Sequence, residues 1–211
     1  MRILVVSATE LEVAPYISTG SGVAHLITGV GAPASQFQLQ MHLQSNRYDL
    51  VIQAGIAGSF DVWPGLSEVV LVRKDVFADL GVFEQGQLHT VFDMGLATQN
   101  EWPYQEGWLV NDHPLLSHYK LKSVIAASVN SLTDNSGIIN LYKQKFGADI
   151  ESMEGAAFHY TCLQMKIPYL QLRSISNRVG ERDKSKWQMR QAVVNLNEEL
   201  AVLIQHSLDS V

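Results

Sequence analysis

Residues 150–177 constrain the fold of this chain more than any other segment. Residues 155–165 have the composition of a buried helix, and the run at 168–175 is apolar enough to be a strand covered on both faces. A polar cluster, Arg-Ser-Ile-Ser-Asn, closes the strand at 173–177. Ligands of open α/β sheets bind outside the carboxyl ends of the strands, so this cluster indicates a binding site.

Short apolar runs alternate with helical patterns along the rest of the chain. The final helix places Met189, Val193, Leu196, Leu200 and Leu203 on one face. This alternation predicts an α/β sheet with helices on both faces, in one domain of 211 residues. The other predicted strands cover residues 3–6, 23–27, 50–52, 69–72 and 124–127, and the other helices 33–44 and 138–146.

The segment at about 79–118 shows neither period and is expected to be a long loop. Its tryptophans, Trp102 and Trp108, argue against disorder. Two readings remain open: a packed excursion or subunit contact, and a wall over one end of a substrate.

Composition excludes several classes of function. The formal net charge of −6 argues against a general nucleic-acid binder. The single cysteine, Cys162, excludes an internal disulfide and fits a reducing compartment. No apolar run approaches a signal peptide or a membrane helix, so we expect a cytoplasmic protein with no membrane partner.

Motifs for cofactors and metals are also missing. Ala34 takes the last glycine position of a dinucleotide fingerprint, and the phosphate-binding loop and the serine-hydrolase motif do not occur. The seven histidines lack zinc-ligand spacing. We therefore expect neither a cofactor nor a metal.

Several polar groups follow predicted strands and would converge in one crevice. Glu12 follows the first strand; taken alone, it is more often a solvated acid in a first helical turn. Glu154 has small neighbours, and its carboxylate could accept two hydrogen bonds from a ribose diol. Asn177 taken alone is a turn residue.

Met153-Glu154 and the 173–177 cluster resemble the purine nucleoside phosphorylase and nucleosidase superfamily, in particular the methylthioadenosine/S-adenosylhomocysteine nucleosidases. SATELEV at 7–13, GVGAPAS at 29–35 and QAGIAGSF at 53–60 follow in the expected order. The resemblance implies a three-layer nucleoside-phosphorylase-like domain with a mixed central sheet. It also implies a small-molecule nucleoside substrate and a homodimer.

The resemblance further implies roles for individual residues. Glu12 would be the general base that activates water, Glu154 would hold the ribose, and Asn177 would read the purine. Asn177 stands where the family has an aspartate, and an amide can donate to N7 and O6 but cannot supply a proton. The other expected substrate-binding residues are Ala57, Gly58, Ser131, Leu132, Met153, Arg173 and Ser176.

Residues 179–187, VGERDKSKW, are similar to the futalosine hydrolase branch, which removes hypoxanthine from futalosine in menaquinone biosynthesis. Arg178 or Arg182 would then meet the substrate carboxylate. Glu12 would repel phosphate. Arg73 and Arg173 are the only arginines near strands from which they could bind phosphate, so water is the expected nucleophile. The alternatives are a methylthioadenosine/S-adenosylhomocysteine nucleosidase, a purine nucleoside phosphorylase and a catalytically silent nucleoside-binding protein.

Overall fold

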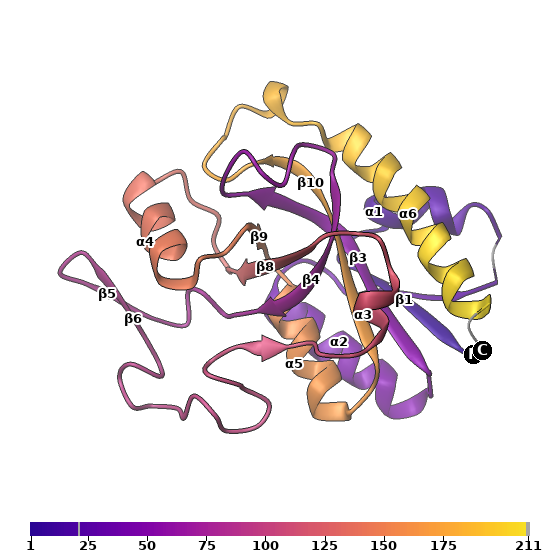
Figure 1. Cartoon of the computed structure of the whole chain (residues 1–211), viewed down its shortest axis with the longest axis horizontal. Coiled ribbons are helices and arrows are strands. Elements are labelled where there is room, and N and C mark those ends of the chain that lie inside the picture. Colours follow the sequence, from indigo (N-terminus) through magenta and orange to yellow (C-terminus); the bar gives the residue numbers. More distant parts are fainter. Residues whose placement is uncertain (21, 210–211) are drawn as a thin grey trace.

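The computed structural model describes residues 1–20 and 22–209, and a large mixed sheet forms its centre (Figure 1). The strand order is β10 (Tyr169–Arg178), β4 (Val69–Asp75), β8 (Ser123–Ser128), β9 (Ile150–Ser152), β3 (Leu50–Ser59), β1 (Ile3–Ser7) and β2 (Ala24–Ile27). An additional pairing joins β10 to β3, so β3, β10, β4, β8 and β9 form a closed ring. β7 (Leu109–Val110) pairs with β4 outside this path.

The sheet is mixed, as expected from the resemblance. β3 runs parallel to β1 and β10 but antiparallel to β9, and β4 runs antiparallel to β10. The two longest strands, β3 and β10, extend well beyond their predicted ends at 52 and 175. Gly55 and Gly58 consequently lie within β3.

Helices cover both faces of the sheet, which confirms the three layers. On β1, Val5 packs in the core cluster of α1 (Glu10–Ile17) and α6 (Met189–Asp209). The adjacent Leu4 packs in the cluster of α2 (Ala32–Ser45) and α5 (Gly155–Met165). Successive side chains of a strand point to opposite faces, so the two helix pairs lie on opposite sides (Figure 1). None of the described helices is long and apolar enough to span a bilayer.

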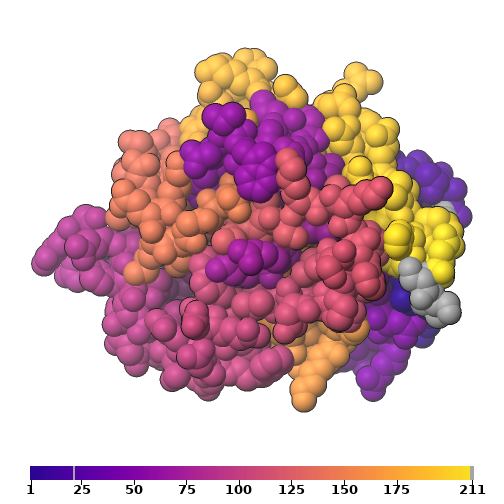
Figure 2. Space-filling view, viewed as in Figure 1, coloured from indigo at the N-terminus to yellow at the C-terminus, as the bar shows by residue number. Residues whose placement is uncertain are grey.

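The 79–118 segment contains regular structure that the sequence pattern did not predict. β5 (Gly81–Glu84) and β6 (Gln87–Thr90) form a hairpin that projects from the body beside α4 (Ser136–Phe146), and α3 (Leu115–His118) follows (Figures 1 and 2). All of β5 is exposed, so it lacks the alternation by which a half-buried strand is recognised. Trp108 packs edge-on against Phe146, with Lys74 over its ring.

Candidate active site

A cavity of about 290 Å³ opens between β3, β10 and the starts of α1 and α5, at the low end of the size range of ligand pockets. Four carboxylates and one arginine line it, together with apolar side chains. Its lining includes Thr9, Glu12, Val30, Ile56, Ala57, Gly58, Leu132, Glu151, Met153, Glu154, Ser176, Asn177, Glu181, Arg182 and Trp187. No residue of the 79–118 segment lines this cavity within the described chain.

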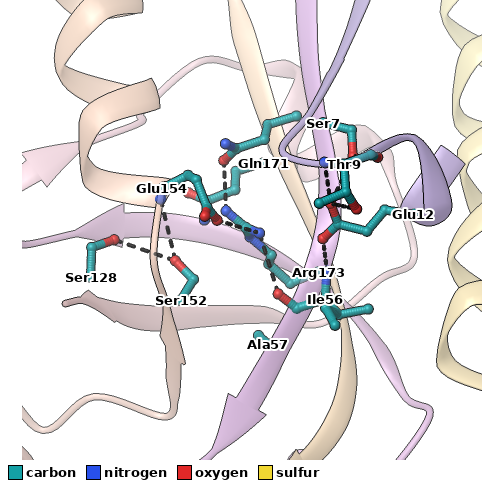
Figure 3. Close-up of polar contacts among 12 residues, drawn as sticks. Ser7, Thr9, Glu12, Ile56, Ala57, Ser128, Ser152, Glu154, Gln171 and Arg173 are labelled. Atoms are coloured by element: carbon teal, nitrogen blue, oxygen red, sulfur yellow. Dashed lines mark hydrogen bonds and ion pairs between the residues drawn. The ribbon is translucent and has the colours of Figure 1, made fainter. Parts of the chain in front are cut away.

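Glu12 is buried and held by four hydrogen bonds (Figure 3). Its Oε2 accepts from Ser7 Oγ at 3.0 Å, Thr9 N at 2.9 Å and Thr9 Oγ1 at 3.0 Å. Among the described residues, its Oε1 accepts only from Ile56 N, at 3.1 Å. A carboxylate oxygen has two acceptor sites, so Oε1 keeps one for a molecule in the cavity. Glu12 is therefore a buried, hydrogen-bonded acid and not a solvated one.

Glu154 lies at the N-terminus of α5 and is 5% exposed. Its Oε1 accepts a hydrogen bond from Gly31 N at 2.9 Å, and its Oε2 lies 3.8 Å from Arg173 Nη1. Gly31 has a φ of 92°, a conformation that favours glycine and directs its N–H at the carboxylate. Burial raises the pKa of Glu154, whereas Arg173 and the Gly31 hydrogen bond oppose that rise.

Arg173 lies behind the cavity, between the two carboxylates (Figure 3). Its guanidinium donates to Gln53 Oε1 at 2.9 Å and to Ile56 O at 3.3 Å. A Cβ added at Gly55 would lie 2.4 Å from Arg173 Nη1 and 3.0 Å from Glu12 Oε1. Glycine at position 55 thus leaves room for both the Arg173 guanidinium and the Glu12 carboxylate. Arg173 itself is buried, with 1% of its surface exposed.

A buried polar cluster supports the start of α5. Ser152 Oγ accepts from Gly155 N at 3.2 Å, and Ser128 Oγ accepts from Ala156 N at 2.8 Å. Ser128 in turn donates to Asp75 Oδ1 at 3.0 Å. These bonds satisfy N–H groups that the first turn of a helix leaves free. They also fix the backbone from which Glu154 projects.

The end of β10 supplies Ser176 and Asn177 to the cavity. Ser176 Oγ donates to Asn177 Oδ1 at 2.7 Å, and Asn177 Nδ2 donates to Arg178 O at 2.8 Å. These contacts orient the amide and leave its second N–H for a ligand. Beyond it, Trp187 lines the cavity and donates to Glu181 O.

Two of the expected substrate-binding residues do not line the cavity. Ser131 lies outside, on an exposed turn whose next residue, Leu132, does reach it. Arg173 is buried behind the acids and is not among the residues that line the cavity. Of the two arginines considered for a substrate carboxylate, Arg178 is occupied: it donates to Ser59 Oγ and to the carbonyls of 61, 62 and 64. Arg182 lines the cavity.

Sequence reasoning missed the residues that hold Glu12 in place. Thr9 and Glu12 form a capping box at the start of α1, and the Thr-x-x-Glu spacing is a recognisable signal for one. Ser128 and Ser152 carried no comparable signal, because they meet Gly155 and Ala156 only through the pairing of β8 with β9.

The sheet, its helix layers and the acid-lined cavity define an α/β protein with a small-molecule site. The chain belongs to the phosphorylase superfamily, whose family model matches residues 5–208. The resemblance noted in the sequence is thus confirmed.

Individual relatives agree with this assignment. Futalosine hydrolase of Thermus thermophilus is 29% identical over 206 residues, which cover 90% of this chain and 89% of the relative. The enzyme of the same name from Streptomyces coelicolor is 28% identical over 162 residues, or 76% and 67% of the two chains.

Two solved structures from Helicobacter pylori share the fold. A 5′-methylthioadenosine/S-adenosylhomocysteine nucleosidase superposes with a TM-score of 0.80 at 16% identity, over 98% of both chains. A futalosine hydrolase gives a TM-score of 0.80 at 15% identity, again over 98% of both. The two scores are equal, so the fold does not separate these two activities.

Proposed function

We propose that this protein is an N-glycosyl hydrolase that cleaves futalosine to hypoxanthine and dehypoxanthine futalosine, a step of menaquinone biosynthesis. The observation that carries the proposal is the pair of carboxylates, Glu12 and Glu154, on one nucleoside-sized cavity. Among the described residues, Arg182 is the only cation that lines this cavity. The sequence relatives named futalosine hydrolase support the choice of substrate.

In the proposed reaction, Glu12 Oε1 accepts a hydrogen bond from a water that attacks the anomeric carbon. As the new C–O bond forms, the C–N bond to the purine breaks, its electron pair stays on the base, and the water proton passes to Glu12. General-base catalysis of this kind contributes about 10²–10⁴-fold. The base gains a proton from solvent on leaving.

Glu154 accepts hydrogen bonds from the ribose hydroxyls in this proposal. The sugar becomes positively charged in the transition state, so a nearby carboxylate binds it more tightly there than in the ground state. Asn177 directs its remaining amide N–H at the N7/O6 edge of the purine and stabilises the departing base by hydrogen bonding.

Water fits this cavity better than phosphate. A phosphate nucleophile needs arginine and backbone donors, but Arg73 is exposed and outside the cavity and Arg173 is paired behind it. Four carboxylates, including Glu12 and Glu154, would repel a dianion. This argument favours hydrolysis over phosphorolysis.

A product assay tests the proposal. The purified protein is incubated with futalosine or methylthioadenosine, with and without phosphate, and the released bases are separated by chromatography. We expect hypoxanthine from futalosine at a rate independent of phosphate. Adenine release at an equal or higher rate would favour the methylthioadenosine nucleosidase alternative. A rate that depends on phosphate would favour the phosphorylase. Release of no base would favour the silent binding protein.

The expected homodimer and cytoplasmic location are also part of the proposal. Val30 lines the cavity and is 57% exposed, and Phe37 and Met41 on α2 are 62% and 50% exposed. A second subunit over this apolar surface would cover the side of the cavity. Light scattering at micromolar concentration should give twice the chain mass of 23.4 kDa; a fully active monomer would contradict the dimer.

A further inference from the structure

Glu151 is a buried acid of the cavity that the proposed reaction does not use. It is 5% exposed, and its Oε2 has no hydrogen-bond partner. Burying a charged carboxylate is costly unless it is protonated or paired. In the ionised state, the unpaired Oε2 of Glu151 therefore fits a ligand that carries a hydrogen-bond donor.

The register of three adjacent strands places Glu151 opposite Asn177. Gly58 of β3 pairs with Asn177 of β10 on one side and with Glu151 of β9 on the other. Both side chains line the same cavity. Neighbouring strands lie about 4.8 Å apart, so the backbones that carry the amide and the carboxylate are about 10 Å apart, with only a glycine between them.

A 6-oxopurine has the complementary groups in the same order. N7 and O6 accept hydrogen bonds on one edge, and the N1–H beside O6 is a donor. An amide at N7 and O6 and a carboxylate at N1 would therefore contact one continuous edge of the base. Adenine differs at both points, since its N6 is a donor and its N1 is an acceptor that an ionised carboxylate repels.

We propose that Glu151 is a specificity-determining residue that accepts a hydrogen bond from N1–H of a 6-oxopurine and disfavours adenine. The inference rests on the proposed function for the location of the base beside Asn177. It adds a second contact, because Asn177 by itself permits both bases.

Burial and two charged side chains set the pKa of Glu151. Burial raises the pKa of Glu151 to about 7; Arg182 on the loop after β10 lowers it, and Asp79 after β4 raises it. Tyr142 of α4 also interacts with the carboxylate: burial, then Asp79 and then Glu151 raise the pKa of this phenol to about 12. Glu151 is therefore an acceptor at mildly alkaline pH.

Binding of free bases tests the contact without requiring turnover. Hypoxanthine, 1-methylhypoxanthine and adenine are titrated by calorimetry into the full chain at pH 8. We expect N1 methylation to weaken binding at least about 10-fold, since it removes a donor and leaves a buried carboxylate unpaired. In Glu151→Ala, which also makes room for the methyl group, the difference should fall to within about threefold.

Glu151→Gln adds a donor at the same place and should raise affinity for adenine relative to hypoxanthine about 10-fold. The control is Glu84→Gln, the same change on the exposed β5 strand, which should leave all affinities unchanged. Melting curves confirm that each variant is folded. If Glu151→Ala does not fold, Glu151→Gln, which keeps the size of the side chain, tests the contact instead.

The inference is overturned if hypoxanthine does not bind, if wild type binds 1-methylhypoxanthine as tightly as hypoxanthine, or if the Glu151 variants keep the wild-type preference. Failure of the proposed function has a different signature. Futalosine would then remain intact in the product assay, while free hypoxanthine would still depend on Glu151 for binding.

Discussion

Glu12 and Glu154 both line the cavity, but their surroundings suit different tasks. Glu12 is fixed by donors on Oε2 and keeps an open acceptor site on Oε1. Glu154 has one backbone donor and the more distant Arg173, so acceptor sites remain on both of its oxygens. One arrangement suits a single water, and the other suits two hydroxyl groups.

Replacing Glu12 with glutamine should lower turnover by about 10²–10⁴-fold, because an amide cannot accept the proton of the attacking water. Substrate binding should change little, since glutamine has the same shape. Single-turnover kinetics and a separate binding titration measure the two effects. Glu10→Gln, an exposed acid of the same helical turn, is the control; near wild-type turnover in the Glu12 variant would remove Glu12 from the mechanism.

The preference between bases should depend on pH through Glu151. Its pKa is raised to about 7, so the carboxylate accepts from N1–H above that pH and becomes a protonated donor below it. The hypoxanthine-to-adenine affinity ratio should therefore be high at pH 8 and fall as pH drops to 6. Calorimetry at both pH values measures the ratio, and Glu151→Gln should show no such fall.

At the scale of elements, the start of α5 connects the core to the site. A Cβ at Gly155 would lie 2.1 Å from Asp75 Oδ2 and 2.3 Å from Gln171 Nε2. Both groups belong to the buried polar cluster below the helix. Glycine at this position therefore lets the helix begin close to the cluster, where Ser128 and Ser152 accept its free N–H groups.

Gly155→Ala should destabilise the protein by about 1–3 kcal/mol, the usual cost of overpacking, and should lower kcat/KM because it displaces Glu154. Denaturant unfolding measures the first effect and steady-state kinetics the second. Gly137→Ala is a matched control at the start of α4, where an added Cβ would meet only the Asn135 side chain, at 3.1 Å. Equal stability in the two variants would show that the start of α5 tolerates a side chain.

At the scale of the whole molecule, buried acids make stability depend on pH. Burial raises the pKa of Asp75 to about 6. The folded protein then holds a proton that the unfolded chain releases near pH 4, so the free energy of unfolding falls as pH rises between these values. The raised pKa of Glu151 likewise lowers the free energy of unfolding as pH rises to about 7.

Asp75→Asn should remove the Asp75 part of this decline. Relative to the variant, wild type should lose on the order of 2–3 kcal/mol between pH 4 and 7, as measured by urea unfolding. Gln171 can turn its amide to meet the new N–H₂ group, since its Oε1 has no partner in the folded protein. The exposed Asp134→Asn is the control; parallel pH profiles for wild type and Asp75→Asn would contradict the prediction.

Apolar patterns in the sequence predicted helices α2, α4, α5 and α6, most of the buried strands and the class of fold. The pattern of apolar residues is a local property of a segment. It is clear in the buried strand Ile3–Ser7 and in the helix Met189–Asp209. The match of motifs from SATELEV to the 173–177 cluster also pointed to the superfamily that the family model confirmed.

The contacts of the polar residues could not be predicted from the sequence, because they depend on pairing between distant strands. Closure of β3 onto β10 placed Arg173 behind the acids rather than in the cavity. The three-residue strand β9, too short to show a period, placed Glu151 beside Gly58 and opposite Asn177. Pairing between segments about a hundred residues apart depends on strand register and on the packing of the whole core, and neither is written in a local pattern.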